Sequence, residues 1–243
     1  VGILMDFYLV ALLPFALGLF FLCYYKPAFY VLLICFLVPL SVFINDVGGG
    51  LGLSIPTEPM IWIVFVMYIF QQVLTGKFEL KFIKMPLVLF ILLNLFWMVL
   101  SALNSTMPFV SIKYLLARLW FVSVFFFFLF KIFQDQNYIR RYFSYMLYGT
   151  ALVVGFTLLK HGAEGFSRGW GYSIMQPFFG DHTIYSAYIT FFVPIALVFA
   201  IRGNWFKFTT IHRLVFAGIA LVLILGIIFS FTRASWISLI AAI

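Results

Sequence analysis

The amino-acid sequence predicts an all-α protein, built as a polytopic bundle of transmembrane helices. The chain of 243 residues is 65% hydrophobic and only 9% charged, and it contains 34 phenylalanines. Soluble domains carry about a quarter charged residues, so a water-soluble fold would have too little polar surface to cover this core. The bilayer is therefore the expected solvent. In lipid, backbone polar groups have to be satisfied within each segment, which favours helices of about twenty residues.

Apolar runs, separated by charged and turn residues, divide the chain into about eight complete spans and the start of a ninth. Pro27, Pro86 and the Gly203–Asn204 pair fall at the boundaries of runs, where residues that start or end helices are expected. We interpret residues 1–243 as a single integral membrane domain. Because the ninth run is too short to cross a bilayer, we expect the chain to be a fragment of a longer protein. The expected spans are 7–25, 28–45, 59–75, 86–103, 114–133, 139–159, 183–201 and 213–231, and the ninth begins near residue 235.

Lysines and arginines are distributed unevenly between two sets of alternating loops. One set holds ten of the fifteen cations and two acidic residues, whereas the other holds five cations and five acidic residues. Cytoplasmic loops of membrane proteins are enriched in Lys and Arg, so we expect the first set to face the cytoplasm. The net charge of +8 is then a signal of topology, and no binding of nucleic acid is expected.

Three cations on the expected outer side lie next to or within apolar helix. They are Lys113, Arg118 and Arg233. Arg118 lies about one turn further into its helix than Lys113, and ionisable residues at such depth usually face a protein interior or a wet cavity with a partner. We therefore expect Arg118 and Arg233 to bind an anion. Lys113 is a further candidate for substrate binding, or an interfacial anchor among phospholipid headgroups.

The longest polar stretch is an expected external loop, residues 160–182, which mixes charged and aromatic side chains with glycines. Functional residues concentrate in loops held by a rigid scaffold. This composition suits sugar binding, because aromatic rings stack on the apolar faces of sugars while polar groups bind hydroxyls. The candidates for substrate binding are Arg168, Trp170 and Tyr172, and the candidates for a catalytic acid or base are Glu164, Asp181 and His182.

The two histidines of this loop allow other interpretations. His161 and His182 could be metal ligands or proton acceptors. No third ligand stands at a recognisable spacing, so we expect neither a metal nor another cofactor. A plain solvated loop is the remaining interpretation of residues 160–182.

Three stretches resemble the bacterial O-antigen ligases and the related O-antigen polymerases of the inner membrane. SFTRASWISLIAA (230–242) is similar to the Ser-x-(Ser/Thr)-Arg-(Gly/Ala)-x-Trp helix start of these proteins. GDHTIYSAYITFFVPIAL (180–197) resembles the segment in which an outer loop enters a helix that ends in a Pro-small-Leu pattern. WMVLSALNSTMPFVSIKYLLARL (97–119) resembles their helix, short outer turn and re-entry.

The resemblance implies a multi-pass protein of the bacterial inner (cytoplasmic) membrane with its active face outward. Such a protein moves a glycan from undecaprenyl pyrophosphate to an acceptor sugar, without a metal or another cofactor. The acceptor is lipid A core for a ligase and a growing glycan chain for a polymerase, and both remain open. The family's outer arginine corresponds to Arg233 and a second, loop arginine to Arg168. The family's functional histidine lies in a later loop, so neither His161 nor His182 is assigned to it.

The chemistry of such a transfer fits these charges. Cleavage of a sugar–pyrophosphate bond leaves a developing anion, which fixed cations stabilise best at low dielectric, and the planar fork of arginine suits phosphate oxygens. We expect Arg233, with Arg168 and Arg118, to bind the pyrophosphate of the lipid-linked donor. Membrane lipid surrounds the protein. A base within hydrogen-bond reach would accept the proton of the acceptor hydroxyl.

Two rival functions remain open at this point. A transporter or flippase for a polysaccharide or another anionic solute could use the same outer arginines. A purely structural membrane subunit would leave Arg118 and Arg233 without a purpose.

Overall fold

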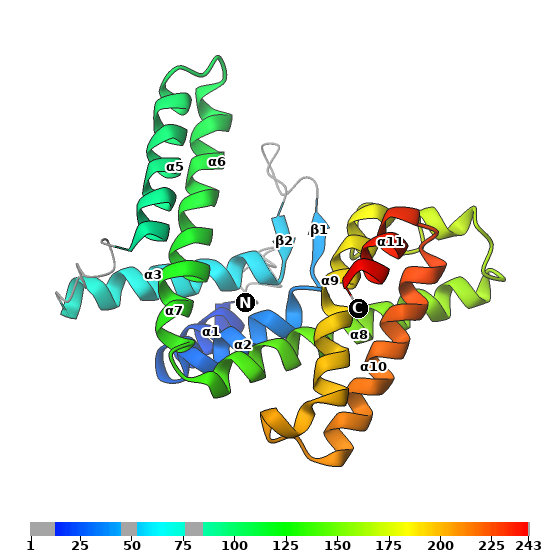
Figure 1. Cartoon of the computed structure of the whole chain (residues 1–243). Coiled ribbons are helices and arrows are strands. Elements are labelled where there is room, and N and C mark those ends of the chain that lie inside the picture. The colour runs from blue at the N-terminus through cyan, green and yellow to red at the C-terminus, as the bar shows by residue number, and fades with distance from the viewer. Residues whose placement is uncertain (1–12, 45–52, 76–84, 243) are drawn as a thin grey trace, which may run out of the picture. The chain divides into compact units, whose positions relative to one another are not determined.

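The computed structural model describes residues 13–44, 53–75 and 85–242 (Figure 1). These residues are helical apart from one small sheet and the connecting turns, which confirms the all-α prediction. The helices are α1 (Leu13–Tyr25), α2 (Pro27–Leu37), α3 (Thr57–Thr75), α5 (Pro86–Leu103), α6 (Pro108–Val122), α7 (Leu129–Ile132), α8 (Gln136–Ala163), α9 (His182–Ile201), α10 (Thr210–Phe229) and α11 (Arg233–Ala242).

Six of the described helices are long and apolar enough to cross a bilayer, so the chain is a multi-pass membrane protein. They are α3, α5, α8, α9, α10 and the helix that begins with α6 and continues into a π-helical turn, Ser123–Phe128. Two shorter apolar helices precede them. One is Ala16–Tyr25, which is part of α1, and the other is α2. The first expected span, 7–25, lies partly outside the described residues. The total of about eight spans therefore stays a prediction.

The expected span 28–45 is wrong in its second half. The helix α2 ends at Leu37, and β1 (Val42–Ile44) pairs antiparallel with β2 (Leu53–Ile55). Pro39 disfavours the helical conformation at the residue before it, which explains why the helix stops there. Beyond the turn, Ser41 Oγ lies 2.6 Å from Thr57 Oγ1 and holds the start of α3 beside the sheet.

The chain forms two compact units, which we describe separately. Unit 1 comprises Val1–Tyr30 and Pro59–Asp135, and unit 2 comprises Val31–Glu58 and Gln136–Ile243. In unit 1, α5 and α6 form a hairpin (Figure 1). The helix α3 packs against the second arm of this hairpin, because the ring centroids of Trp62 and Trp120 are 4.4 Å apart.

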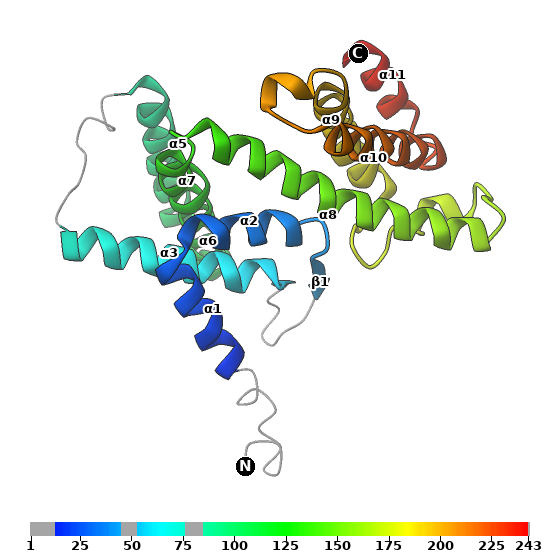
Figure 2. The ribbon, with the colours of Figure 1, turned by 90° about the horizontal axis from the view of Figure 1, so that it is seen from below.

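Unit 2 is built around α9 and α10, which lie side by side (Figures 1 and 2). The helix α8 packs against both at Gly226 of α10, where a Cβ atom would lie 2.6 Å from Val154 Cγ1 and 3.2 Å from Tyr185 Oη. Small residues of this kind allow membrane helices to approach closely. Thr157 Oγ1 of α8 and Tyr185 Oη of α9 are 2.6 Å apart in the same layer.

The two ends of unit 2 differ in charge. The end formed by the loop 164–181 and the turn 230–232 is called the loop end here, and the opposite end is called the basic end. At the basic end, Arg140 donates to the carbonyl of Phe206 and Arg213 Nε donates to the carbonyl of Ala200. The described cations of that end are Arg140, Arg141, Arg202, Lys207 and Arg213. This separation matches the two sets of loops expected for this part of the chain.

Candidate anion-binding site at the loop end of unit 2

An aromatic cluster joins the turn 230–232 to the loop 164–181. Phe166 stacks on Phe229 with ring centroids 4.4 Å apart, and the His161 ring lies 6.0 Å from Phe229 and 6.2 Å from Phe231. Phe231 has a positive φ of 54°, which turns the chain sharply between α10 and α11. The turn and the loop, about sixty residues apart in sequence, are therefore one packed structure.

His161 serves this packing. Its side chain is only 1% exposed, and its Nε2 lies 2.9 Å from the carbonyl oxygen of Ser167, to which it donates a hydrogen bond. The residue belongs to the last turn of α8, which continues to Ala163. The polar loop thus begins after Ala163, later than the expected 160. His161 has no access to a substrate at this depth.

Four of the predicted site residues form a continuous polar row, which comprises Arg168, Tyr172, His182 and Asp181. Arg168 Nε donates to Tyr172 Oη at 3.0 Å, and the Tyr172 ring packs edge-on against His182 with centroids 4.7 Å apart. His182 Nδ1 lies 2.7 Å from Asp181 Oδ1. With Nδ1 as the donor, Nε2 of this histidine is left as the proton acceptor.

Asp181 begins α9 and fixes the end of the row. Its Oδ1 accepts hydrogen bonds from the backbone N–H of Thr183 at 2.9 Å and from Thr183 Oγ1 at 3.0 Å, as an N-cap residue does. The Thr183 backbone N–H, the Thr183 hydroxyl and His182 together hold the pKa of the Asp181 carboxyl below its ordinary value. The group therefore stays ionised and orients the imidazole of His182.

Arg233 is the first residue of α11, and its side chain is exposed. The helix start is held in place by its neighbours, because Ser235 Oγ donates to Ser186 Oγ of α9 at 2.8 Å and Trp236 Nε1 donates to the carbonyl of Ile227 at 3.0 Å. Arg233 itself forms no hydrogen bond or ion pair with the described part of the chain. The SFTRASW stretch thus forms a packed turn that exposes the guanidinium of Arg233 near the start of α9.

Two other predicted residues of the loop lie at its surface. Glu164 and Trp170 are both exposed, and within residues 13–44, 53–75 and 85–242 neither side chain forms a hydrogen bond. They remain candidates by position alone. Lys160, on α8, donates to the carbonyl of Gln176 at 3.4 Å.

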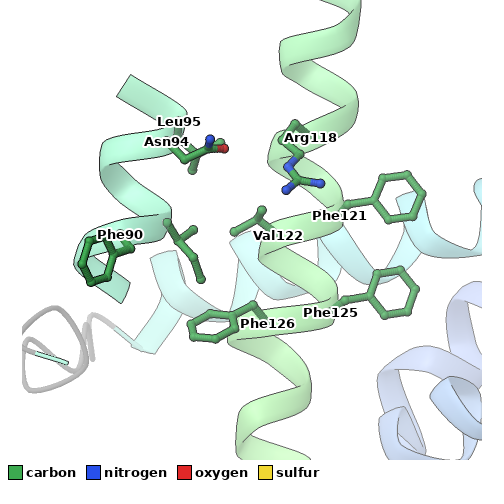
Figure 3. A pocket seen from close by; sticks show the side chains of 9 residues that line it. Phe90, Asn94, Leu95, Arg118, Phe121, Val122, Phe125 and Phe126 are labelled. Atoms are coloured by element: carbon green, nitrogen blue, oxygen red, sulfur yellow. The ribbon is translucent and has the colours of Figure 1, made fainter. Parts of the chain in front are cut away.

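Arg118 and Lys113 belong to unit 1, so the structure does not join them to the polar row. The expected start of their span at residue 114 is wrong, because α6 begins at Pro108. Proline is favoured in the first helical turn. Arg118 therefore lies ten residues, or about 15 Å, from the helix start, deeper than a helix start at residue 114 implies. It lines a cavity of about 480 Å³ between α5 and α6, opposite Asn94 (Figure 3).

Sequence reasoning missed the residues that assemble the site. Ser186 and Ser235 form the hydrogen bond that places α11, and Gly171 gives room for the ring of Phe231. All three are small residues within patterns typical of ordinary membrane helices and loops. No periodicity distinguishes them, so their role could be found only from the tertiary arrangement.

Within the described residues, no three His, Cys, Asp or Glu side chains are grouped to hold a metal ion. Comparison with models of protein families, with curated proteins and with solved structures gives no match to this chain.

Proposed function

We propose that this protein transfers a glycan from undecaprenyl pyrophosphate to an acceptor sugar at the outer face of the bacterial inner membrane, as an O-antigen ligase or polymerase does. One observation carries the proposal. The Ser235–Ser186 hydrogen bond holds the start of α11 against the start of α9, where Asp181 and His182 lie, and α11 begins at Arg233, which has no partner among the described residues. A cation and a candidate base thus belong to adjacent helix starts.

The position of Arg233 at a helix N-terminus favours a bound anion. The N-terminus of a helix carries a partial positive charge, which disfavours cations and attracts anions. Arg233 is the first residue of α11. Its guanidinium and the backbone N–H groups of Arg233 and Ala234, which donate to no acceptor among the described residues, favour the same kind of ligand. A pyrophosphate, with oxygens that match the planar fork of arginine, meets this requirement.

The reaction needs one bond made and one broken. The acceptor hydroxyl oxygen forms a bond to the anomeric carbon of the donor glycan, and the bond from this carbon to the pyrophosphate oxygen breaks. The electron pair leaves with undecaprenyl pyrophosphate, whose developing charge Arg233 and Arg168 stabilise. The hydroxyl proton passes to a base, and His182 Nε2 is the best-oriented candidate because Asp181 Oδ1 lies 2.7 Å from Nδ1.

The loop end faces outward in this proposal. The cations Arg140, Arg141, Arg202, Lys207 and Arg213 lie at the basic end, and the positive-inside tendency puts such an end in the cytoplasm. The polar row then lies at the level where the lipid-linked donor exposes its pyrophosphate and its glycan.

The direct test is a transfer assay with the full chain in proteoliposomes. The donor is an undecaprenyl-pyrophosphate-linked glycan, and two acceptors are offered separately, lipid A core and a free repeat-unit glycan. We expect glycan product in step with released undecaprenyl pyrophosphate for one of them, which also separates ligase from polymerase. Removal of a hydrogen-bonding side chain that stabilises the developing charge lowers the rate of an enzyme about 10²–10³-fold. We therefore expect Arg233→Ala to lower the transfer rate by this factor and Arg233→Lys to restore part of it.

Lys207→Ala supplies the matched control, because this exposed cation belongs to the basic end. Its transfer rate should equal that of the unmodified chain. An Arg233→Ala protein with full activity would exclude the proposed role. Passage of intact donor or anionic glycan across the vesicle, with no bond cleaved, would support the transporter instead.

A further inference from the structure

The cavity between α5 and α6 contains the positive charge of Arg118. Figure 3 shows the Arg118 guanidinium turned into the space between the two helices, with the Asn94 side chain of α5 directed toward it. The rest of the lining is apolar. Arg118 forms no hydrogen bond or ion pair with any residue that the structure describes.

Both polar residues lie near the middle of their spans. Asn94 is nine residues from the end of α5 at Leu103, and Arg118 is ten residues from the start of α6, which is about 13–15 Å along each helix. The hydrocarbon core is about 30 Å thick. Arginines near helix ends reach the headgroups by snorkelling, but this one is about half a bilayer away from them.

The described spans of this chain cannot supply a counter-charge at that depth. Their only acidic residue is Glu58, which lies in the first turn of α3. The hairpin is also sparsely covered, because only 6% of the residues in each of its two spans are buried, compared with 44% in α8 and α9. A second copy of these spans brings the same lack of carboxylates.

We propose that this groove binds a transmembrane helix of another protein, one that carries an Asp or Glu at the middle of its own span. The carboxylate pairs with the Arg118 guanidinium, whose N–H groups donate to both of its oxygens, and Asn94 Nδ2 donates a further hydrogen bond to it. The apolar lining contacts the helix on either side of the carboxylate. This interaction is independent of the proposed glycan transfer.

The test measures association between the labelled full chain and synthetic helices in neutral phosphatidylcholine vesicles by energy transfer. The probe is a leucine-rich transmembrane peptide of about twenty residues with one central Glu, and its counterparts carry Gln or Leu there. Polar interhelical contacts in membranes allow a preference of about tenfold, which we expect for the Glu peptide over the Leu peptide. The Gln peptide should bind weakly.

Variants of the chain separate geometry from charge. Arg118→Leu should abolish the preference, and Arg118→Lys should keep part of it. The double variant Arg118→Leu/Leu119→Arg moves the charge around the same helix at nearly the same depth, and it should also lose the preference. Arg118→Glu should reverse selectivity toward a peptide with a central Lys.

Three results would overturn the proposal. The first is equal binding of the Glu and Leu peptides, or a preference that survives Arg118→Leu. The second is complete displacement of the Glu peptide by anionic phospholipid, which would make a lipid phosphate the occupant. The third is self-association of the chain that depends on Arg118 and excludes the peptide.

Discussion

The ring of Phe231 lies against Gly171, and a Cβ atom at Gly171 would stand 2.7 Å from Phe231 Cδ2. This contact joins the turn before α11 to the loop that carries the polar row. Contacts this short are not tolerated, and the rigid ring has to move if a methyl group is added. The position of Arg233 thus depends on the absence of one side chain.

We expect Gly171→Ala to destabilise unit 2 by about 1–3 kcal/mol, the usual cost of overpacking a close contact. Thermal unfolding in detergent measures this loss. Gly169→Ala is the matched control, because a Cβ at Gly169, two residues earlier in the same loop, would have none of the described residues beyond its chain neighbours within 4 Å. Equal stabilities of the two variants would show that Phe231 yields without cost.

A second close approach, at Gly226 of α10, predicts a matched pair of helix variants. Gly226→Ala places a methyl group 2.6 Å from Val154 Cγ1, so we expect it to separate α8 from α10 and lower the stability of unit 2 by about 1–3 kcal/mol. At Gly218, on the same helix, no atom of the described residues outside the local helix backbone lies within 4 Å of the added atom. Gly218→Ala should be neutral or stabilising by up to about 1 kcal/mol, because Ala has the higher helix propensity. The prediction is wrong if both variants shift unfolding in the same direction.

The helix bounds could be predicted where punctuation coincides with the edge of an apolar run. The helix α5, Pro86–Leu103, follows the expected span because Pro86 begins it and the polar Asn104 ends it. Hydropathy marks only the lipid-crossing part of a helix, so α8 extends beyond the expected 139–159 at both ends. The charge of Lys113 suggested that a helix begins at residue 114, but α6 begins at Pro108 and continues through Lys113. The sequence-based prediction therefore placed Arg118 too close to the membrane surface.

The residues of the candidate site could be predicted from the composition of the loop, but their spatial arrangement could be predicted only in part. The loop was identified by its charged and aromatic residues, and Arg168, Tyr172, His182 and Asp181 do lie in one row. The links between them depend on how α9 begins and how the loop turns back, and these are tertiary facts. The role of His161 could not be predicted either, because a titratable side chain and a packing side chain look alike in sequence.

The hydrogen bond from Ser235 to Ser186 predicts a measurable coupling between α11 and α9. Ser235→Ala and Ser186→Ala each remove one partner of the 2.8 Å contact. Interhelical hydrogen bonds in membrane proteins are worth about 0.6 kcal/mol on average and at most about 1.7 kcal/mol. We expect a double-mutant cycle of unfolding free energies to give a coupling in this range. Ser238→Ala is a control on the same helix, because its hydroxyl bonds to the Ala234 carbonyl within α11.

The capping carboxylate of Asp181 predicts a dependence of stability on pH. The Thr183 backbone N–H, then the Thr183 hydroxyl, lower the pKa of this carboxyl from its ordinary value of 3.8. A carboxyl whose pKa is lower in the folded state contributes stability above the unfolded value, and this contribution is lost as pH falls through the folded value. We therefore expect the unmodified chain to unfold at a higher temperature than Asp181→Ala at pH 7, and the difference to shrink as the pH falls below 3.8.

Thermal unfolding of both proteins from pH 7 to pH 3 measures this, with Thr183→Val as a control that removes the hydroxyl but keeps the backbone donor. A difference that stays constant over the whole range would mean that the Asp181 charge does not stabilise the start of α9.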